Sequence, residues 1–290
     1  MSDVCAQGVD TGFAALSYSQ IALLGVVQGI TELLPISSTA HMRVVPALLG
    51  WRDPGAAFSA AMQLAALTAV VSYFWRDVRE LAVGSVRAIV HRNFGDRQLR
   101  LALWIALATL PIVLAGALLS RPLNACASPL RSVAVIGWAC IAMAVLLAMA
   151  EVLAKHRRTV EEITILDVMI VGIAQAGALI PGVSRSGSTL TAALGRGLKR
   201  AEAARFSFLL GLPAIALAGF RELWTLHGLH MASHAWSLLA FGLVVASVSA
   251  FAAIWGLMRI LERFSAWPFV AYRAVLGVVL IVGAASGQLI

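Results

Sequence analysis

Charged residues and cysteines are both scarce in this chain of 290 residues. Only 12% of the residues are charged, whereas about 25% are charged in a typical soluble domain. The 60% hydrophobic content and the mean hydropathy of +0.89 exclude a soluble domain and indicate a polytopic membrane protein. Cys5, Cys126 and Cys140 are too few and too scattered for a disulfide framework or a zinc site, so we expect them to be small residues of the interior.

Acidic residues are fewer than basic ones, 14 against 22, and the net charge is +8. A basic excess can indicate nucleic-acid binding, but these basic residues lie between apolar stretches and are not interleaved with aromatic residues on one face. We therefore expect no nucleic-acid partner and assign the basic residues to membrane orientation. Residues 1–16 contain no Lys or Arg, so we expect that the first apolar segment is not a cleaved signal peptide.

Six apolar stretches are each about 20 residues long, which is enough for a helix to cross a bilayer. They are 56–75, 101–119, 133–153, 206–223, 236–257 and 269–289. Two further apolar stretches, 21–49 and 165–198, are interrupted by proline, glycine and polar residues. Non-helical backbone at membrane depth needs partners from protein or from a water-filled cavity, so we expect each to be a re-entrant helix-loop-helix hairpin. The predicted fold is an all-α integral membrane protein, with six transmembrane helices and two re-entrant hairpins in a single membrane domain, 1–290.

Most basic residues fall on one side of the membrane if each hairpin returns to the face from which it enters. These fifteen residues are Arg76, Arg79, Arg87, Arg92, Arg97, Arg100, Lys155, Arg157, Arg158, Arg196, Lys199, Arg200, Arg205, Arg259 and Arg263. The positive-inside rule makes this side cytoplasmic. The first hairpin and both termini are then expected on the outer side.

The spacing of polar residues predicts an inverted repeat, with halves 17–154 and 164–290. Each half holds one hairpin and three spans, and each hairpin starts with a possible capping box, Ser17-x-x-Gln20 or Thr164-x-x-Asp167. A glycine and then a glutamine follow at equal spacings in both halves, and a one-residue slip then aligns Pro35 with Pro181 and Ser38 with Ser184. Because an odd number of spans separates the hairpins, the second copy is expected upside down, with the two tips meeting near the midplane.

The first hairpin concentrates groups that are costly within a membrane. Glu32 follows Gln28 by four residues, so both side chains lie on one helix face just before Pro35. A carboxylate at this depth indicates a functional site, with Arg185 as its natural partner, although packing against the other hairpin is the alternative. The residues that follow, Ser37, Ser38, Thr39 and His41, supply the hydroxyls and imidazole of a nucleophile or proton relay, or else merely bond to helix backbone.

The second hairpin carries a run typical of phosphate binding, Pro181-Gly182-Val183-Ser184-Arg185-Ser186-Gly187-Ser188-Thr189. Glycines allow backbone amides to approach an anion, hydroxyls add donors, and the planar guanidinium of Arg185 suits phosphate oxygens. A following helix would place its positive end at the same anion. The alternative is a glycine-serine kink in which Arg185 only neutralises Glu32.

At these residues the sequence resembles the undecaprenyl-diphosphatase family, bacterial membrane enzymes associated with bacitracin resistance. The first motif is Gln28-x-x-x-Glu32 followed by Leu34-Pro35-x-Ser37-Ser38-Thr39-x-His41. The second is Pro181-Gly182-x-Ser184-Arg185-Ser186-Gly187-x-Thr189, and the run Arg205-Phe206-Ser207-Phe208-Leu209-Leu210-x-x-Pro213 is also similar. The likeness spans nearly the whole chain.

The resemblance implies hydrolysis of the terminal phosphate of undecaprenyl diphosphate, which gives the monophosphate carrier used in peptidoglycan synthesis. It also implies a bacterial plasma (inner) membrane enzyme with a periplasmic active site, a divalent cation such as Mg2+ or Ca2+, and a homodimer. The family accepts Glu or Gln at position 28, so Gln28 leaves Glu32 as the main anionic metal ligand.

The motif residues divide into two predicted groups. The catalytic group is Glu32, Ser38, His41 and Arg185. The substrate-binding group is Gln28, Ser37, Thr39, Gly182, Ser184, Ser186, Gly187 and Thr189. Ser38 attacks with His41 accepting its proton, or His41 activates water, and the sequence does not choose between these hypotheses. The competing function is a polyprenyl-phosphate flippase or transporter that uses the same inverted-repeat site without bond cleavage.

Overall fold

The computed structural model describes residues 11–124, 130, 132–229 and 231–287, with side chains described in these ranges except at 56 and 120–124. Within these ranges the regular elements are eleven α-helices, two 3-10 helices and one isolated bridge, between Arg158 and Leu198. Cys140 is a buried free thiol, as expected for an interior residue. Cys5 and Cys126 lie outside the described residues, as do 1–10 of the segment that lacks basic residues.

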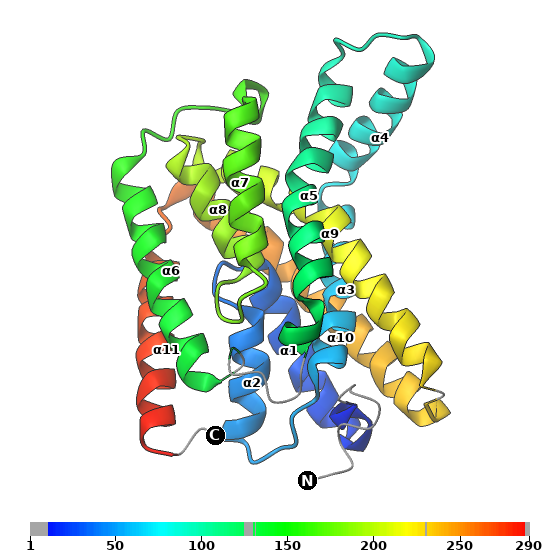
Figure 1. Ribbon diagram of the computed structural model, residues 1–290, viewed down its shortest axis with the longest axis vertical. Helices are drawn as coiled ribbons and strands as arrows, with labels where there is room; N and C mark the ends of the chain where they lie inside the picture. The colour runs from blue at the N-terminus through cyan, green and yellow to red at the C-terminus, as the bar shows by residue number, and fades with distance from the viewer. Residues whose placement is uncertain (1–10, 125–129, 131, 230, 288–290) are drawn as a thin grey trace.

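The first half of the chain begins with a 3-10 turn and six helices. They are η2 (Gly12–Ala15), α1 (Tyr18–Leu33), α2 (Ser38–Leu48), α3 (Ala56–Tyr73), α4 (Trp75–Val90), α5 (Arg97–Asn124) and α6 (Val133–Leu153). Helix α1 rises to the middle of the bundle and α2 returns to the end from which α1 started, while α5 and α6 run along the bundle (Figure 1). The capping box predicted at Ser17 and Gln20 is present at the start of α1.

The second half starts from the opposite end of the bundle. Its elements are η4 (Val160–Glu162), α7 (Ile165–Gly177), α8 (Arg185–Gly195), α9 (Arg200–Gly228), α10 (Ser233–Arg263) and α11 (Trp267–Ala285). Helix α7 descends to the middle and α8 returns, so that the breaks after α1 and after α7 lie near each other (Figure 1). The predicted capping box of Thr164 and Asp167 is present at the start of α7.

Among the described residues, five helices are long and apolar enough to cross a membrane, which makes the chain a multi-pass membrane protein. These candidate spans are Arg97–Leu119, Val133–Leu153, Arg200–Gly228, Ser233–Arg263 and Trp267–Ala285. A sixth arises if α3 and α4 form one span, but the two are bent by 82° at the break between them. The predicted span 56–75 is therefore wrong at its end, since α3 stops at Tyr73 and Trp75 belongs to the next helix.

The last span, predicted as 269–289, is also wrong at its end, because α11 stops at Ala285. Gly287 follows with a φ of 71°, the left-handed conformation that commonly ends a helix. Apolar content alone therefore overestimated the length of this helix.

Helix α4 was not predicted, because residues 76–100 lie between two predicted apolar spans and contain several arginines. It packs against the start of α5, and the two project together from one end of the bundle (Figure 1). Gly84 permits this packing, since a Cβ there would lie 2.8 Å from the Cβ of Gln98. An ion pair between Asp77 and Arg205 fastens the start of α4 to α9.

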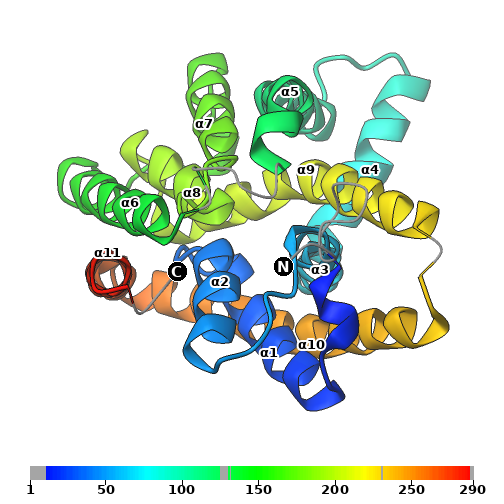
Figure 2. The ribbon, with the colours of Figure 1, turned by 60° about the horizontal axis from the view of Figure 1, so that its bottom comes forward.

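The helices pack in matching pairs. Helix α1 lies along α10 and α7 lies along α5, while α3 packs on α9 and α6 on α11 (Figure 2). Glycines allow the closest approaches: a Cβ at Gly29 would lie 2.8 Å from the backbone nitrogen of Ala250, and one at Gly172 would lie 2.8 Å from the carbonyl oxygen of Ala108. This packing fixes both broken helices in the centre of the bundle.

Candidate active site

Each break ends in a serine that starts the next helix. Ser37 and Ser184 have φ values of 74° and 70°, which are uncommon for residues with a side chain and persist only when the surroundings hold them. The hydroxyl of Ser37 accepts a hydrogen bond from the amide of Ala40, and that of Ser184 from the amide of Gly187. Both helices therefore begin with the same cap.

These caps correct the alignment expected from the sequence. Ser184 corresponds to Ser37 and not to Ser38, with an offset of 184 − 37 = 147 residues. The two capping boxes have the same offset, 164 − 17 = 147, so no slip intervenes between them and the caps. Pro35 and Pro181 suggested the slip, because the prolines lie at different places in the two breaks.

The carboxylate of Glu32 is the centre of the site. Glu32 is only 6% exposed, and its Oε2 accepts hydrogen bonds from Gln28 Nε2 at 3.1 Å and from Ser38 Oγ at 2.6 Å. Its Oε1 lies 3.3 Å from Nη2 of Arg185. The expected contact between Arg185 and Glu32 thus forms, and it joins α8 to α1. A buried carboxylate needs such partners to offset the loss of hydration.

Gly211 of α9 determines where the Arg185 guanidinium lies. A Cβ at position 211 would overlap Nη1 of Arg185 and would lie 3.0 Å from its Cζ. The guanidinium therefore rests on bare helix backbone on its way to Glu32. The sequence did not single out Gly211, although a glycine in an apolar helix is a signal of close packing.

Ser186 and Thr189 point into the protein interior. The Ser186 hydroxyl donates to the backbone oxygens of Glu32 and Leu34, both at 3.1 Å, and so fastens α8 to the end of α1. Thr189 donates to the carbonyl oxygen of Arg185 at 2.8 Å and contacts the hydroxyl of Ser207. These two predicted substrate-binding residues lie behind the Glu32 and Arg185 pair, where they support it.

Arg273 of α11 joins both breaks and was missed as a site residue. Its Nη1 donates to the carbonyl oxygen of Pro35 at 3.0 Å, while Nη2 donates to those of Gly182 at 2.8 Å and Val183 at 3.0 Å. Gly182 has a φ of 95°, and a Cβ there would lie 2.6 Å from the carbonyl oxygen of Ile136, so only glycine fits. The sequence did offer an indication of this role, because a charged arginine within an apolar span usually has a function.

His41 has partners on both ring nitrogens. Nδ1 lies 2.7 Å from the carbonyl oxygen of Ser37, which can only accept, so Nδ1 carries a proton. Nε2 lies 2.6 Å from the hydroxyl of Tyr272, which donates to it when the ring is neutral. The hydroxyl of Ser38 is instead hydrogen-bonded to Glu32. The imidazole thus anchors α2 to α11.

A cavity of about 590 Å³ adjoins the two breaks. Thr39 and Pro181 line it, together with apolar residues of α5 and α9 and with the charged side chains of Arg43, Asp53, Arg221 and Glu222. Glu32, Ser38 and Arg185 are not among its lining residues, so Thr39 is the predicted site residue that faces it most directly. A wall that is both apolar and charged suits an amphiphilic molecule.

The oxygen atoms beside Glu32 bear on whether a metal ion fits. Among the described residues, no group of three or more His, Cys, Asp and Glu side chains forms a metal site. Oε1 of Gln28, however, is buried without a hydrogen-bond partner and belongs to the amide that donates to Glu32. One carboxylate and one spare amide oxygen fit a hard cation that takes its other ligands from phosphate and water.

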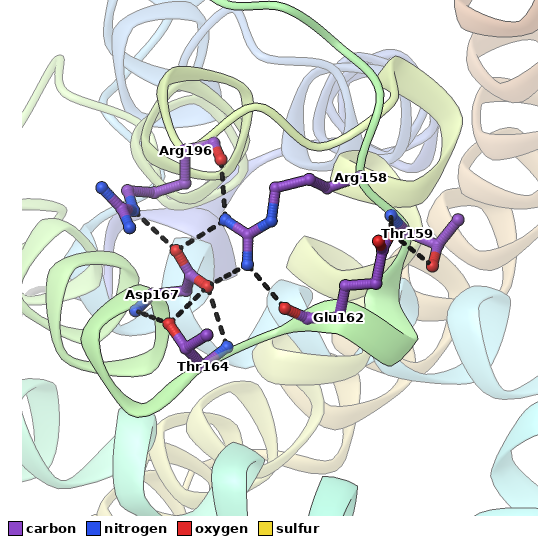
Figure 3. A network of polar contacts seen from close by, with 6 residues as sticks. All are labelled: Arg158, Thr159, Glu162, Thr164, Asp167 and Arg196. Carbon is purple, nitrogen blue, oxygen red and sulfur yellow. Dashed lines mark hydrogen bonds and ion pairs between the residues drawn. The ribbon is translucent and has the colours of Figure 1, made fainter.

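A second polar network lies at the far end of α7 from its break (Figure 3). The carboxylate of Asp167 accepts from Arg158 at 2.6 and 3.1 Å, from Arg196 Nε at 2.6 Å and from the amide of Thr164 at 2.8 Å. Burial acts to raise the pKa of Asp167, but these hydrogen bonds outweigh it and hold the pKa well below its usual value. The network ties the connection after α6 to both helices of the second pair.

Comparison with known proteins gives consistent similarities. The family described as bacitracin resistance protein BacA matches residues 21–279. A protein named undecaprenyl-diphosphatase 2, from Mesorhizobium japonicum, is 73% identical over 263 residues, which are 91% of this chain and 100% of that protein. Undecaprenyl-diphosphatase from Gloeobacter violaceus is 56% identical over 201 residues, 69% of each chain. That from Trichormus variabilis is 51% identical over 216 residues, 74% of this chain and 68% of the relative.

Proposed function

This chain belongs to the bacitracin resistance protein BacA family, and from that premise we propose that it is an undecaprenyl diphosphate phosphatase. It hydrolyses the terminal phosphate of the lipid diphosphate and releases undecaprenyl phosphate and inorganic phosphate. The observation that carries the proposal is the meeting of Arg185, Glu32 and Ser38 from three different helices. A phosphate-binding cation, a base and a hydroxyl nucleophile are the groups that this reaction requires.

Arg185 holds the terminal phosphoryl group and stabilises the charge that develops on its oxygens. Helices α2 and α8 both begin at the site, so their positive ends and their first amides favour an anion there. Ser184 and Gly187 maintain the start of α8, and Ser37 maintains that of α2.

Ser38 is the nucleophile and Glu32 accepts its proton. The bond from Ser38 Oγ to phosphorus forms as the phosphoanhydride bond breaks, and undecaprenyl phosphate leaves. Glu32 passes the proton of Ser38 to the departing undecaprenyl phosphate and is again a free carboxylate. Water then attacks the phosphoserine: Glu32 takes a proton from the water and returns it to Ser38 Oγ as the bond to phosphorus breaks, and inorganic phosphate leaves. The hydrogen bond of 2.6 Å from Ser38 to Glu32 favours Glu32 over His41 as the base, since both nitrogens of His41 have other partners. Direct attack by water on the lipid is the alternative.

Glu32 and Gln28 Oε1 are the residues that would hold Mg2+ or Ca2+, with phosphate oxygens and water as the other ligands. Such a cation would neutralise charge on the diphosphate. The chain itself would contribute one carboxylate oxygen donor and one amide oxygen.

We further propose that α1 with α2 and α7 with α8 are re-entrant hairpins of an inverted repeat. Their opposite directions and their identical caps support this (Figure 1). The arginine-rich end of the bundle then faces the cytoplasm, and the cavity beside Thr39 opens toward the periplasm of a bacterial inner-membrane protein. A homodimer rests on the family resemblance alone.

A flippase or transporter would need Arg185 as a grip for lipid phosphate but would not need a nucleophile bonded to a base. The pairing of Ser38 with Glu32 therefore favours hydrolysis. The test is phosphate release from polyprenyl diphosphate by purified protein, with and without a chelator. Hydrolysis by the native chain and its loss in Arg185→Ala are expected. Lipid movement across vesicles without phosphate release would overturn the proposal.

A further inference from the structure

Arg273 is a buried cation whose described hydrogen bonds all go to backbone carbonyl oxygens. Arg273 is only 1% exposed, and none of the described carboxylates forms an ion pair with it. Removing a guanidinium from water is costly, so a residue of this kind within an apolar span indicates a function by default. Its location between the two breaks suggests which function.

The two ends of the guanidinium fork hold different halves of the site. Nη1 binds the carbonyl oxygen of Pro35, which lies between Glu32 and Ser38 in the chain. Nη2 binds the carbonyl oxygens of Gly182 and Val183, which directly precede the cap of α8. The fork is planar and rigid, so one side chain fixes the distance between the segment that carries the carboxylate and the segment that carries Arg185.

The packing around the guanidinium leaves little room for adjustment. A Cβ at Gly187 would lie 2.9 Å from Nη1 of Arg273, and Gly182 lies directly against α6. The Nη atoms of Arg273 are bound to the three carbonyl oxygens of the breaks, whereas Arg185 is the arginine that is paired with Glu32.

We propose that Arg273 is a positioning residue for phosphoryl transfer, which holds the two breaks at the separation where Ser38, Glu32 and Arg185 act together. This inference rests on the proposed function. It differs from a role in stability alone, because it requires that the geometry of the site, and not only the amount of folded protein, depends on the guanidinium.

The kinetic test compares Arg273→Gln and Arg273→Lys with the native chain in detergent. We expect kcat of the folded protein to fall about 100-fold in Arg273→Gln, the scale of a 1 Å misplacement, with KM changed less than about threefold. Arg273→Lys recovers part of this loss, because an ammonium group can bind one break but cannot span both. Arg200→Gln is the control, since Arg200 pairs with Glu151 away from the breaks, and its kcat should stay near native.

The geometric test measures the distance between spin labels at Thr39 and Ile180, one in each hairpin. Cys5 and Cys126 are replaced by serine, and buried Cys140 is retained. Ile180 is 44% exposed and Thr39 faces the cavity, so both accept a label. We expect a narrow distance distribution in the native chain, a broad one in Arg273→Gln and an intermediate one in Arg273→Lys. If Arg273→Gln does not fold, the comparison of Arg273→Lys with the native chain is the test.

Three results would overturn the positioning role: an unchanged distance distribution, a loss confined to thermal stability with native kcat, or a rise in KM with native kcat. The distance measurement does not depend on catalysis. If the native chain releases no phosphate, the proposed function fails. The distance measurement then still shows whether Arg273 fixes the separation of the two hairpins.

Discussion

The helix pair of α1 and α2 and the pair of α7 and α8 share one design but carry different chemistry. Both start with a capping box, break at the centre of the bundle and resume at a serine of positive φ. At the common offset of 147 residues, Glu32 corresponds to Leu179 and Ser38 to Arg185. In the proposed site, the first pair therefore supplies the carboxylate and the hydroxyl, and the second pair supplies the cation. If the proposed inverted repeat is correct, equivalent positions of the two copies carry different chemistry.

The two pairs also differ at their outer ends. Asp167 is buried and bound to two arginines (Figure 3). Its equivalent, Gln20, is a partly exposed neutral residue bonded to Ser17. The second pair is thus fastened at its outer end by the two ion pairs of Asp167, whereas Gln20 is bonded to a neighbouring serine. Arg273 binds the breaks of both pairs. This comparison predicts which substitutions impair chemistry and which impair stability.

The largest effect is expected at the cation of the second pair. Arg185→Ala should lower kcat about 10³-fold or more, as the loss of an arginine that stabilises a transferring phosphoryl group does. Arg185→Lys should recover only part of this, because it lacks the planar fork. Phosphate release by purified, monodisperse protein measures the effect. A loss of less than tenfold would remove Arg185 from the phosphoryl site.

The second-largest loss of activity is expected when the proton acceptor, Glu32, is replaced. Glu32→Gln keeps the shape but cannot accept the proton of Ser38, and kcat should fall about 10² to 10⁴-fold. Single-turnover quenching of the native protein should yield phosphoserine at position 38, and Ser38→Ala should yield none. Phosphate release at a native rate by Ser38→Ala would instead favour attack by water.

A smaller effect is expected from the glycine beneath the Arg185 guanidinium. A methyl group in Gly211→Ala would displace the guanidinium from Glu32, and kcat should fall about 10 to 100-fold. Gly256→Ala is the matched control, since a Cβ there meets nothing within 4 Å. If both alanine variants had equal kcat values, Gly211 would have no part in placing Arg185.

Substitutions at the outer end of the second helix pair, where Asp167 lies, should lower the stability more than the turnover. Asp167→Asn leaves two arginines without their buried partner and should destabilise the protein by about 3 kcal/mol. The equivalent change in the first pair, Gln20→Ala, should cost less than about 1 kcal/mol. Thermal unfolding in one detergent compares the two. Equal losses of stability in the two variants would show that Asp167 stabilises its helix pair no more than Gln20 does.

The melting temperature at low pH should depend on the carboxylate of Asp167. Because the folded pKa of Asp167 is lowered, its stabilisation is complete above the ordinary carboxyl pKa, near 3.8, and is lost as the pH falls below it. Asp167→Asn should therefore show a weaker decline in melting temperature between about pH 4 and pH 2 than the native chain. A parallel decline in both proteins would contradict this assignment.

Local patterns predicted the parts of this molecule that depend on neighbours in sequence. The capping boxes, the two breaks and the contact of Glu32 with Arg185 followed from spacing and from the cost of charge in an apolar segment. Arg273 and Gly211 were missed, because their roles arise only when α11 and α9 pack across the breaks. Helix α4 was missed because its arginines interrupt the apolar pattern although one face packs on α5.

The most direct test of a single shared site is a double-mutant cycle between the two pairs. Phosphate release is measured for Glu32→Gln, Arg185→Gln and the double variant. If the acid and the cation act as one unit, the double variant loses little more activity than the worse single variant. Losses that multiply would show that the two pairs act independently, and this would contradict the account.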